Sequence, residues 1–173
     1  MNRLLGFFLI FLLLSFASVS FASGESQKVS YDLPYPGILP NNPLYFLKAV
    51  RDNFVGYLIS EPLKKSEYDL LQSDKRLVSS QKLLEEGNAE LSITTLSKSG
   101  NYFYSAIENA AFAKSQGKDA TPILDKMLNA SKKHQEIISE MVQKAKEKNK
   151  PSFVDLLKRT KSFQEKVEQI KSK

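Results

Sequence analysis

Residues 42–173 contain five successive runs in which apolar side chains recur every three or four positions. This spacing places the apolar side chains of each run on one face of an α-helix. Proline, glycine or asparagine separates the runs, and no segment has the sustained apolar–polar alternation that is typical of a strand. The sequence therefore predicts an all-α fold, an up-and-down bundle of about five helices joined by short turns.

The residues between the runs predict where the helices begin. Asn42 followed by Pro43 is a favourable start, because asparagine caps free N–H groups and proline has no N–H to satisfy. Thr121 and Pro122 repeat this pattern. The expected helices span residues 42–60, 63–86, 89–115, 121–150 and 152–173.

Two details of these helices follow from single residues. Ser152 and Asp155 form a capping box at the start of the last helix. A break at Gly100 is an alternative to one continuous helix at 89–115, because glycine weakens a helix interior. The apolar periodicity continues in phase across Gly100, so we expect one helix, with the glycine allowing close approach by a neighbour.

The apolar faces of the first two helices are expected to pack inside the bundle. In the second helix leucines recur every seven residues, a seam suited to antiparallel packing: Leu63, Leu70, Leu77 and Leu84. The first helix has a stripe wide enough to contact two neighbours: Leu44, Phe46, Leu47, Val50, Phe54, Tyr57 and Leu58.

The first 22 residues have the pattern of an export signal. Arg3 gives a positive start, residues 4–14 are uninterruptedly apolar, and Ser20-Phe21-Ala22 offers a small-x-small site for cleavage before Ser23. We therefore expect an exported protein of the cell envelope or the extracellular space. The alternative is an uncleaved membrane anchor, since residues 4–22 approach the roughly 20 residues that span a bilayer.

Three parts of the chain are expected: a signal peptide at 1–22, a disordered start and proline-rich strap at 23–41, and a helical domain at 42–173. Prolines prevent the strap from forming a helix and favour extended geometry. Its large apolar residues are unusual for a free linker, so we expect them to cover an end or groove of the bundle: Leu33, Tyr35, Ile38 and Leu39.

The residue types needed for most catalytic and metal sites are scarce. The chain has no cysteine, which rules out disulfides and thiolate ligands, and His134 is its only histidine. We expect His134 to flank the apolar face of the fourth helix. The sequence thus predicts no catalytic, cofactor or metal site and a non-enzymatic binding or structural protein. The alternative is an envelope hydrolase that uses carboxylates or hydroxyls without a metal.

Two groups of residues are candidate contact sites. Residues 126–173 carry 13 basic and 6 acidic side chains, and four lysines crowd into seven positions: Lys144, Lys146, Lys148 and Lys150. In an exported protein such charge favours anionic envelope polymers or lipid headgroups over nucleic acid, or it forms a solvated helix end. Tyr102 and Tyr104 flank a core phenylalanine and either contact a partner, such as another envelope protein, or pack against a neighbouring segment.

Several short motifs resemble those of an uncharacterised bacterial family, a domain of unknown function. Residues 40–48 read Pro-x-x-Pro-Leu-Tyr-x-x-Lys, and the following helix contains Asp74-Lys75-Arg76-Leu77 before a turn at Gly87-Asn88. The likeness covers about residues 36–111. It implies a helical protein of bacterial origin that is exported or membrane-anchored, and it implies no catalytic or binding residues.

Overall fold

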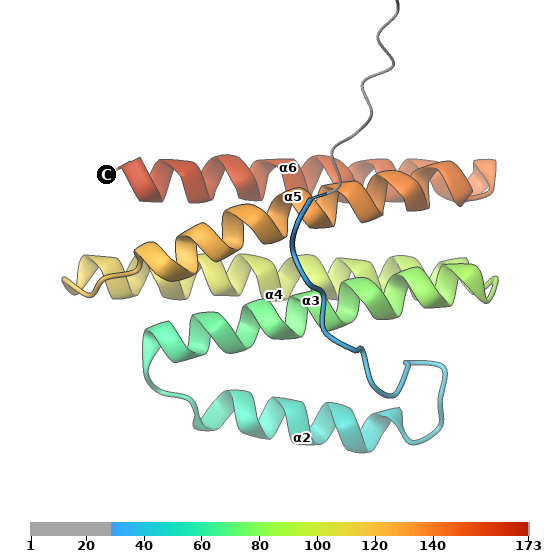
Figure 1. Ribbon diagram of the computed structural model, residues 1–173. Helices are drawn as coiled ribbons and strands as arrows, with labels where there is room; N and C mark the ends of the chain where they lie inside the picture. The colour runs from blue at the N-terminus through green and yellow to red at the C-terminus, as the bar shows by residue number, and fades with distance from the viewer. Residues whose placement is uncertain (1–28, 173) are drawn as a thin grey trace, which may run out of the picture.

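The computed structural model describes residues 29–172 and confirms the predicted fold class. Within that range the chain forms five α-helices, one short 3-10 turn and no strand: α2 (Tyr45–Leu58), α3 (Pro62–Glu85), α4 (Ala89–Ser115), α5 (Thr121–Lys144), η1 (Glu147–Asn149) and α6 (Lys150–Ser172). Successive helices run in opposite directions, as Figure 1 shows. The predicted export signal, residues 1–22, lies outside the described residues.

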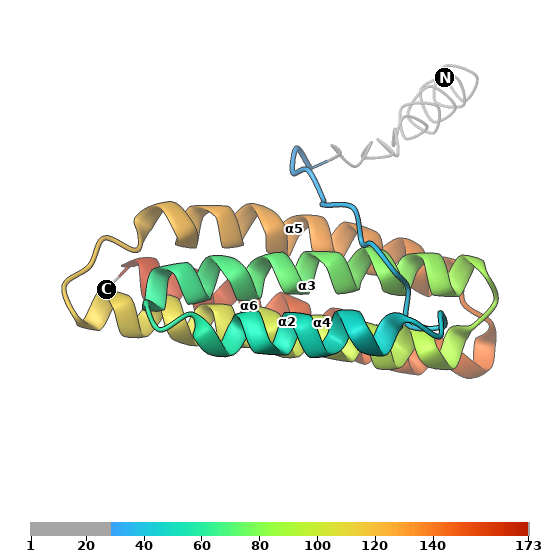
Figure 2. The same ribbon diagram turned by 90° about the horizontal axis from the view of Figure 1, so that it is seen from below.

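Helices α3 to α6 form a four-helix bundle, and α2 lies outside it against α3 (Figures 1 and 2). The buried apolar side chains form two clusters, one around Phe103 and Met127 and one around Leu77 and Phe153. No helix within residues 29–172 has both the length and the hydrophobicity needed to cross a bilayer. The two clusters form the core that holds the bundle together.

Helices α3 and α4 are joined by a ladder of serine hydroxyls. Ser73 and Ser99 each donate to the other's carbonyl oxygen, at 2.9 and 2.8 Å, and Ser80 and Ser92 do the same at 2.8 Å. Ser66 donates to the Ala106 carbonyl at 2.8 Å. Because these positions recur every seven residues on both helices, small side chains line the whole contact and allow the backbones to approach closely.

The leucine seam of α3 and the close approach at Gly100 are confirmed. Leu70 and Leu77 are fully buried, while Leu63 and Leu84 are half-buried at the two ends of the helix. Helix α4 continues through Gly100, where a Cβ would lie 3.2 Å from a guanidinium nitrogen of Arg159 on α6. The glycine thus leaves room for α6.

Two predicted helix starts are wrong by two or three residues. The Asn42 side chain accepts from the Leu44 N–H at 2.9 Å, so it closes a turn before α2, which begins at Tyr45. Helix α6 begins at Lys150, which places Ser152 inside the first turn instead of at the cap. Pro151, the second residue of α6, is tolerated because first-turn N–H groups have no partner within the helix.

The cap of α5 also differs from the prediction. The Thr121 N–H donates to the side chain of Asp119 at 2.9 Å, and Thr121 is the first helical residue. Asp119 satisfies one of the free N–H groups at this helix start, and Pro122 follows within the first turn.

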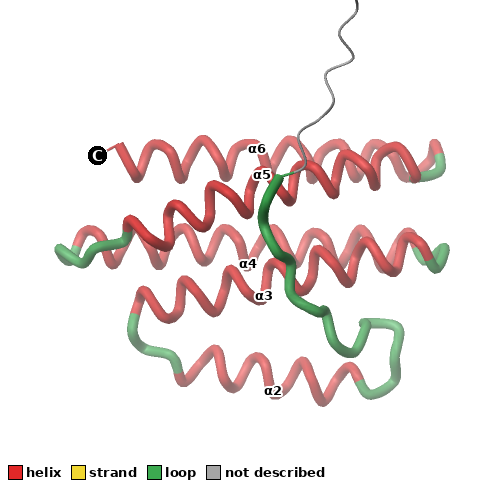
Figure 3. Tube along the Cα trace, in the orientation of Figure 1, coloured by secondary structure: helices red, strands yellow, loops and turns green. Residues whose placement is uncertain are grey.

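The strap crosses α3 on its way from α5 to α2, without regular secondary structure (Figure 3). Tyr31 and Leu33 pack against the two core clusters. Tyr35 and Ile38 are 77% and 41% exposed instead of covering a groove, while Pro36 between them is buried. The strap therefore has one side on the bundle and one side in solvent.

Candidate functional site

The structure brings three of the four candidate lysines together. Lys144, Lys146 and Lys148 are exposed and line a groove of about 270 Å³ beside the turn between α3 and α4. Lys144 lies 3.8 Å from a carboxylate oxygen of Glu85, and Lys150 pairs with Glu147 outside the groove. Glu85, together with Glu90 in the lining of the groove, partly offsets its positive charge.

The two candidate tyrosines do not share a surface. The guanidinium of Arg76 lies 4.1 Å from the ring centroid of Tyr102, whose hydroxyl reaches the Asn53 side chain of α2 at 3.5 Å. Tyr104 is half-exposed on another side of α4, with the Lys166 ammonium 4.3 Å from its ring centroid. Tyr102 is thus part of the contact between α2 and the bundle.

His134 is buried, so its predicted place on a helix flank is wrong. Its Nε2 lies 2.7 Å from Oδ1 of Asp74, which is also buried, and its ring meets the edge of Phe103. The other Asp74 oxygen accepts from the Tyr31 hydroxyl of the strap at 2.7 Å. Burial and the Asp74 carboxylate raise the pKa of Tyr31. This network joins the strap, α3 and α5, and it was missed because its members lie far apart in the sequence.

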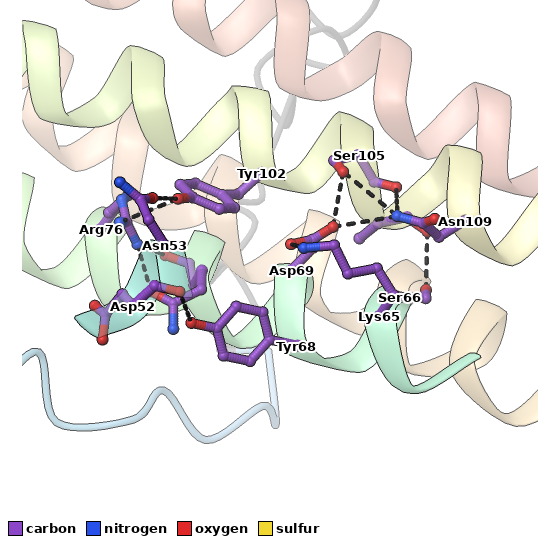
Figure 4. Close-up of polar contacts among 12 residues, drawn as sticks. Asp52, Asn53, Lys65, Ser66, Tyr68, Asp69, Arg76, Tyr102, Ser105 and Asn109 are labelled. Atoms are coloured by element: carbon purple, nitrogen blue, oxygen red, sulfur yellow. Dashed lines mark hydrogen bonds and ion pairs between the residues drawn. The ribbon is translucent and has the colours of Figure 1, made fainter. Parts of the chain in front are cut away.

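Polar contacts also fix α2 and α4 on α3 (Figure 4). Asp69 is buried and accepts from Lys65 at 3.1 Å, Ser105 at 2.7 Å and Asn109 at 3.2 Å. The Tyr68 hydroxyl donates to a backbone carbonyl of α2 at 2.6 Å. Burial and the nearby Asp52 carboxylate raise the pKa of Tyr68 to about 12, so the phenol keeps its proton at neutral pH.

The side of α2 that touches α3 consists of small and polar residues. Asp52 and Gly56 are buried, and a Cβ on Gly56 would lie 3.1 Å from the Tyr68 ring. The Asp52 carboxylate pairs with Arg51 at 2.7 Å. Any larger residue at position 56 would have to displace the Tyr68 ring or the Lys65 ammonium, so this close contact helps to fix which side of α2 faces the bundle.

The apolar stripe of α2 therefore points away from the bundle, and its predicted burial is wrong. We call these side chains the outward face of α2; they are 55% to 86% exposed: Leu44, Phe46, Leu47, Val50, Phe54, Tyr57 and Leu58. At about 100° per residue, Phe54 lies opposite the line through Asp52 and Gly56. The i, i+4 row of Asp52 and Gly56 was the sequence signal for this orientation.

A basic pocket of about 460 Å³ lies between the strap and α2. Its cations are Lys48, Arg51 and Lys75, and its apolar lining includes the exposed Tyr35 and Ile38. Among the described residues that line it there is no carboxylate, although Arg51 pairs with the adjacent Asp52. An apolar surface bordered by cations is suited to a ligand that has both an apolar part and a negative charge.

The Lys48 ammonium holds the strap against α2. It donates to the Pro36 carbonyl at 2.6 Å and to the Ile38 carbonyl at 3.3 Å. Burial lowers the pKa of Lys48; the Asp52 carboxylate opposes this effect, and the neighbouring Arg76, Lys75 and Arg51 add to it. Several positive charges therefore lie close together at this edge of α2.

The described residues contain no group of three or more side chains placed to hold a metal ion. Residues 37–173 match the model of a family described as Domain of unknown function (DUF5667). The motif likeness ended at about residue 111, and the family match continues beyond it through α5 and α6. No curated protein and no solved structure matches the chain significantly.

Proposed function

Since the chain belongs to the family Domain of unknown function (DUF5667), we propose its role from its own surface. It is an exported, non-enzymatic helical-bundle protein that acts in the cell envelope as a binding module, through the outward face of α2. The observation that carries this proposal is the exposure of a continuous apolar stripe on one helix. Contiguous apolar patches of this kind mark interaction sites, because leaving them in water is unfavourable.

The attachment of α2 supports a displayed surface. Its inward side is held by the Tyr68 hydrogen bond and by the close contact at Gly56, and Lys48 ties the helix to the strap. Rotating the helix to bury the apolar stripe would break these contacts and bring large side chains to the place where Gly56 now fits against Tyr68. The outward face is therefore free to meet a partner while the fold stays intact.

The export signal supports a place in the envelope. Residues 4–14 form the apolar run of a signal, with cleavage before Ser23, or a membrane anchor if the signal is retained. The groove at Lys144, Lys146 and Lys148 is a second candidate contact, for an anionic envelope polymer. Such a contact would weaken as salt rises, since exposed charges are screened over about 8 Å at physiological ionic strength.

The carboxylate-based hydrolase has less support. Asp69 is bound by three donors, and Asp74 by His134 and Tyr31. A carboxylate that is saturated by hydrogen bonds inside the protein is poorly placed to take a proton from a substrate. These aspartates are better explained as structural groups that accept hydrogen bonds from the side chains around them.

A photo-crosslinking experiment tests the proposed function. A photoreactive residue replaces Phe54 in the full chain, and in a matched variant it replaces Phe112, an exposed phenylalanine of α4. After irradiation of the cells that produce the protein, we expect adducts in the envelope fraction from position 54 and few from position 112. Equal adduct yields at the two positions, or none at 54, would contradict the proposal.

A further inference from the structure

We infer that the outward face of α2 lies on the surface of an anionic phospholipid bilayer, with a lipid phosphate in the adjoining basic pocket. This inference rests on the proposed function, because it names the partner of the same face. It follows from three properties of the described residues: the chemistry of the stripe, the charge beside it and the way the strap extends it.

The stripe has the composition of a helix that lies in a membrane interface. It combines Phe46 and Phe54 with leucines and a valine, and the most exposed member is Tyr57, whose hydroxyl tolerates water. Helices of this kind bury the apolar face to a depth of about 5–10 Å while their polar face stays outside. In α2 the polar side is attached to the bundle, so the 14-residue helix lies flat and the bundle stays in solvent.

The basic pocket supplies the charge complementarity. Lys75 makes no ion pair with any described residue, and Lys48 uses two of its three N–H groups on strap carbonyls. An anion in the pocket would meet both ammonium groups and the exposed guanidinium of Arg51. It would also offset the mutual repulsion that contributes to the lowered pKa of Lys48.

The strap places apolar side chains on the far side of the same pocket. Tyr35 and Ile38 are exposed there, opposite Leu47 of α2. A phosphate in the pocket would thus have apolar side chains on two sides, which is the arrangement at the boundary between lipid headgroups and acyl chains. An isolated phosphate ion would leave these side chains in water.

The same charges disfavour a second copy of the chain as the occupant. In a two-fold dimer through the outward face, the cationic edge formed by Lys48, Arg51 and Lys75 would lie near its own copy. The described residues that line the pocket offer no carboxylate to meet it. An anionic surface matches both the stripe and its cationic edge.

Fluorescent labelling of single cysteines tests the inference. Because the chain has no cysteine, Phe54→Cys and Phe112→Cys each give a unique position for an environment-sensitive dye. The full chain is mixed with vesicles of phosphatidylcholine alone or with added phosphatidylglycerol. We expect a blue shift and stronger emission at position 54 with the anionic vesicles, and little change at position 112. Position 112 controls for any membrane contact made by the N-terminal apolar run.

Charge variants test the pocket itself. Lys75→Glu should weaken the response at position 54 about fivefold or more. Each basic group near an anionic surface contributes about 1 kcal/mol of binding free energy, which corresponds to about a fivefold change in affinity. Lys132→Glu, at an exposed lysine of α5, should leave it unchanged. Inorganic phosphate should not displace the protein at concentrations that leave the ionic strength nearly constant.

Other outcomes would overturn the inference. An equal response to neutral and anionic vesicles would contradict the anionic bilayer as the partner, because phosphatidylcholine carries a phosphate but no net charge. A concentration-dependent response at position 54 without vesicles would identify a second copy as the partner. If position 54 stays exposed with both vesicles while it crosslinks to a protein in cells, the bilayer is wrong and the proposed binding function stands. If it also fails to crosslink, both are wrong.

Discussion

Replacing Asp74 by alanine should lower the free energy of unfolding by about 3–5 kcal/mol, because removing one member of a buried polar pair leaves the other without its partner. Asp74 is 3% exposed, and its two oxygens meet His134 and the Tyr31 hydroxyl, each at 2.7 Å. The substitution leaves both groups without their hydrogen-bond partner and releases the strap from α3. Urea unfolding followed by circular dichroism at neutral pH measures the effect.

Asp155 provides the matched control for this substitution. It is an exposed aspartate of α6 that pairs with Lys158 at the surface, so Asp155→Ala should change the stability by less than about 1 kcal/mol. A similar small loss for Asp74→Ala would show that the network contributes little to the fold.

Replacing Ser73 by leucine should cost about 3 kcal/mol, through overpacking and the loss of hydrogen bonds to Ser99. Ser73 lies fully buried in the middle of the contact between α3 and α4. Its hydroxyl donates to the Ser99 carbonyl, and the Ser99 hydroxyl donates to the Ser73 carbonyl. A leucine needs space that the closely spaced helices do not provide. The same urea unfolding experiment measures the loss.

Two further variants separate the causes. Ser73→Ala keeps the close approach and loses only hydrogen bonds, so its cost should be smaller, about 1–2 kcal/mol. Ser162→Leu introduces the same side chain at an exposed position of α6 and should be nearly neutral. Equal effects of leucine at positions 73 and 162 would contradict the close packing of α3 and α4.

Much of the fold follows from local sequence. The leucine seam around Leu70 and Leu77, the turn at Gly87 and the continuity of α4 through Gly100 depend on spacing along one helix or on one residue's backbone. Helix starts were less predictable, because Asn42 and Asp119 both satisfy free N–H groups but at different distances from the first helical residue. A capping residue alone does not fix where the helix begins.

The candidate site was harder to predict because it depends on contacts between distant segments. Periodicity shows that Leu47, Val50 and Phe54 share a face of α2, but it does not show whether that face points inward. The answer came from the opposite face, where Gly56 fits against Tyr68. His134 posed the same difficulty, since its partner Asp74 lies on another helix.

The orientation of α2 is the central claim, and two adjacent cysteine variants test it most directly. Ala49 is half-buried on the side that faces α3, whereas Val50 is 65% exposed on the outward face. In the full chain without membranes, a maleimide should react with Val50→Cys nearly as fast as in the urea-unfolded protein, and with Ala49→Cys more slowly. The reverse order would mean that α2 buries its apolar stripe, and it would contradict both the outward face and the binding role assigned to it.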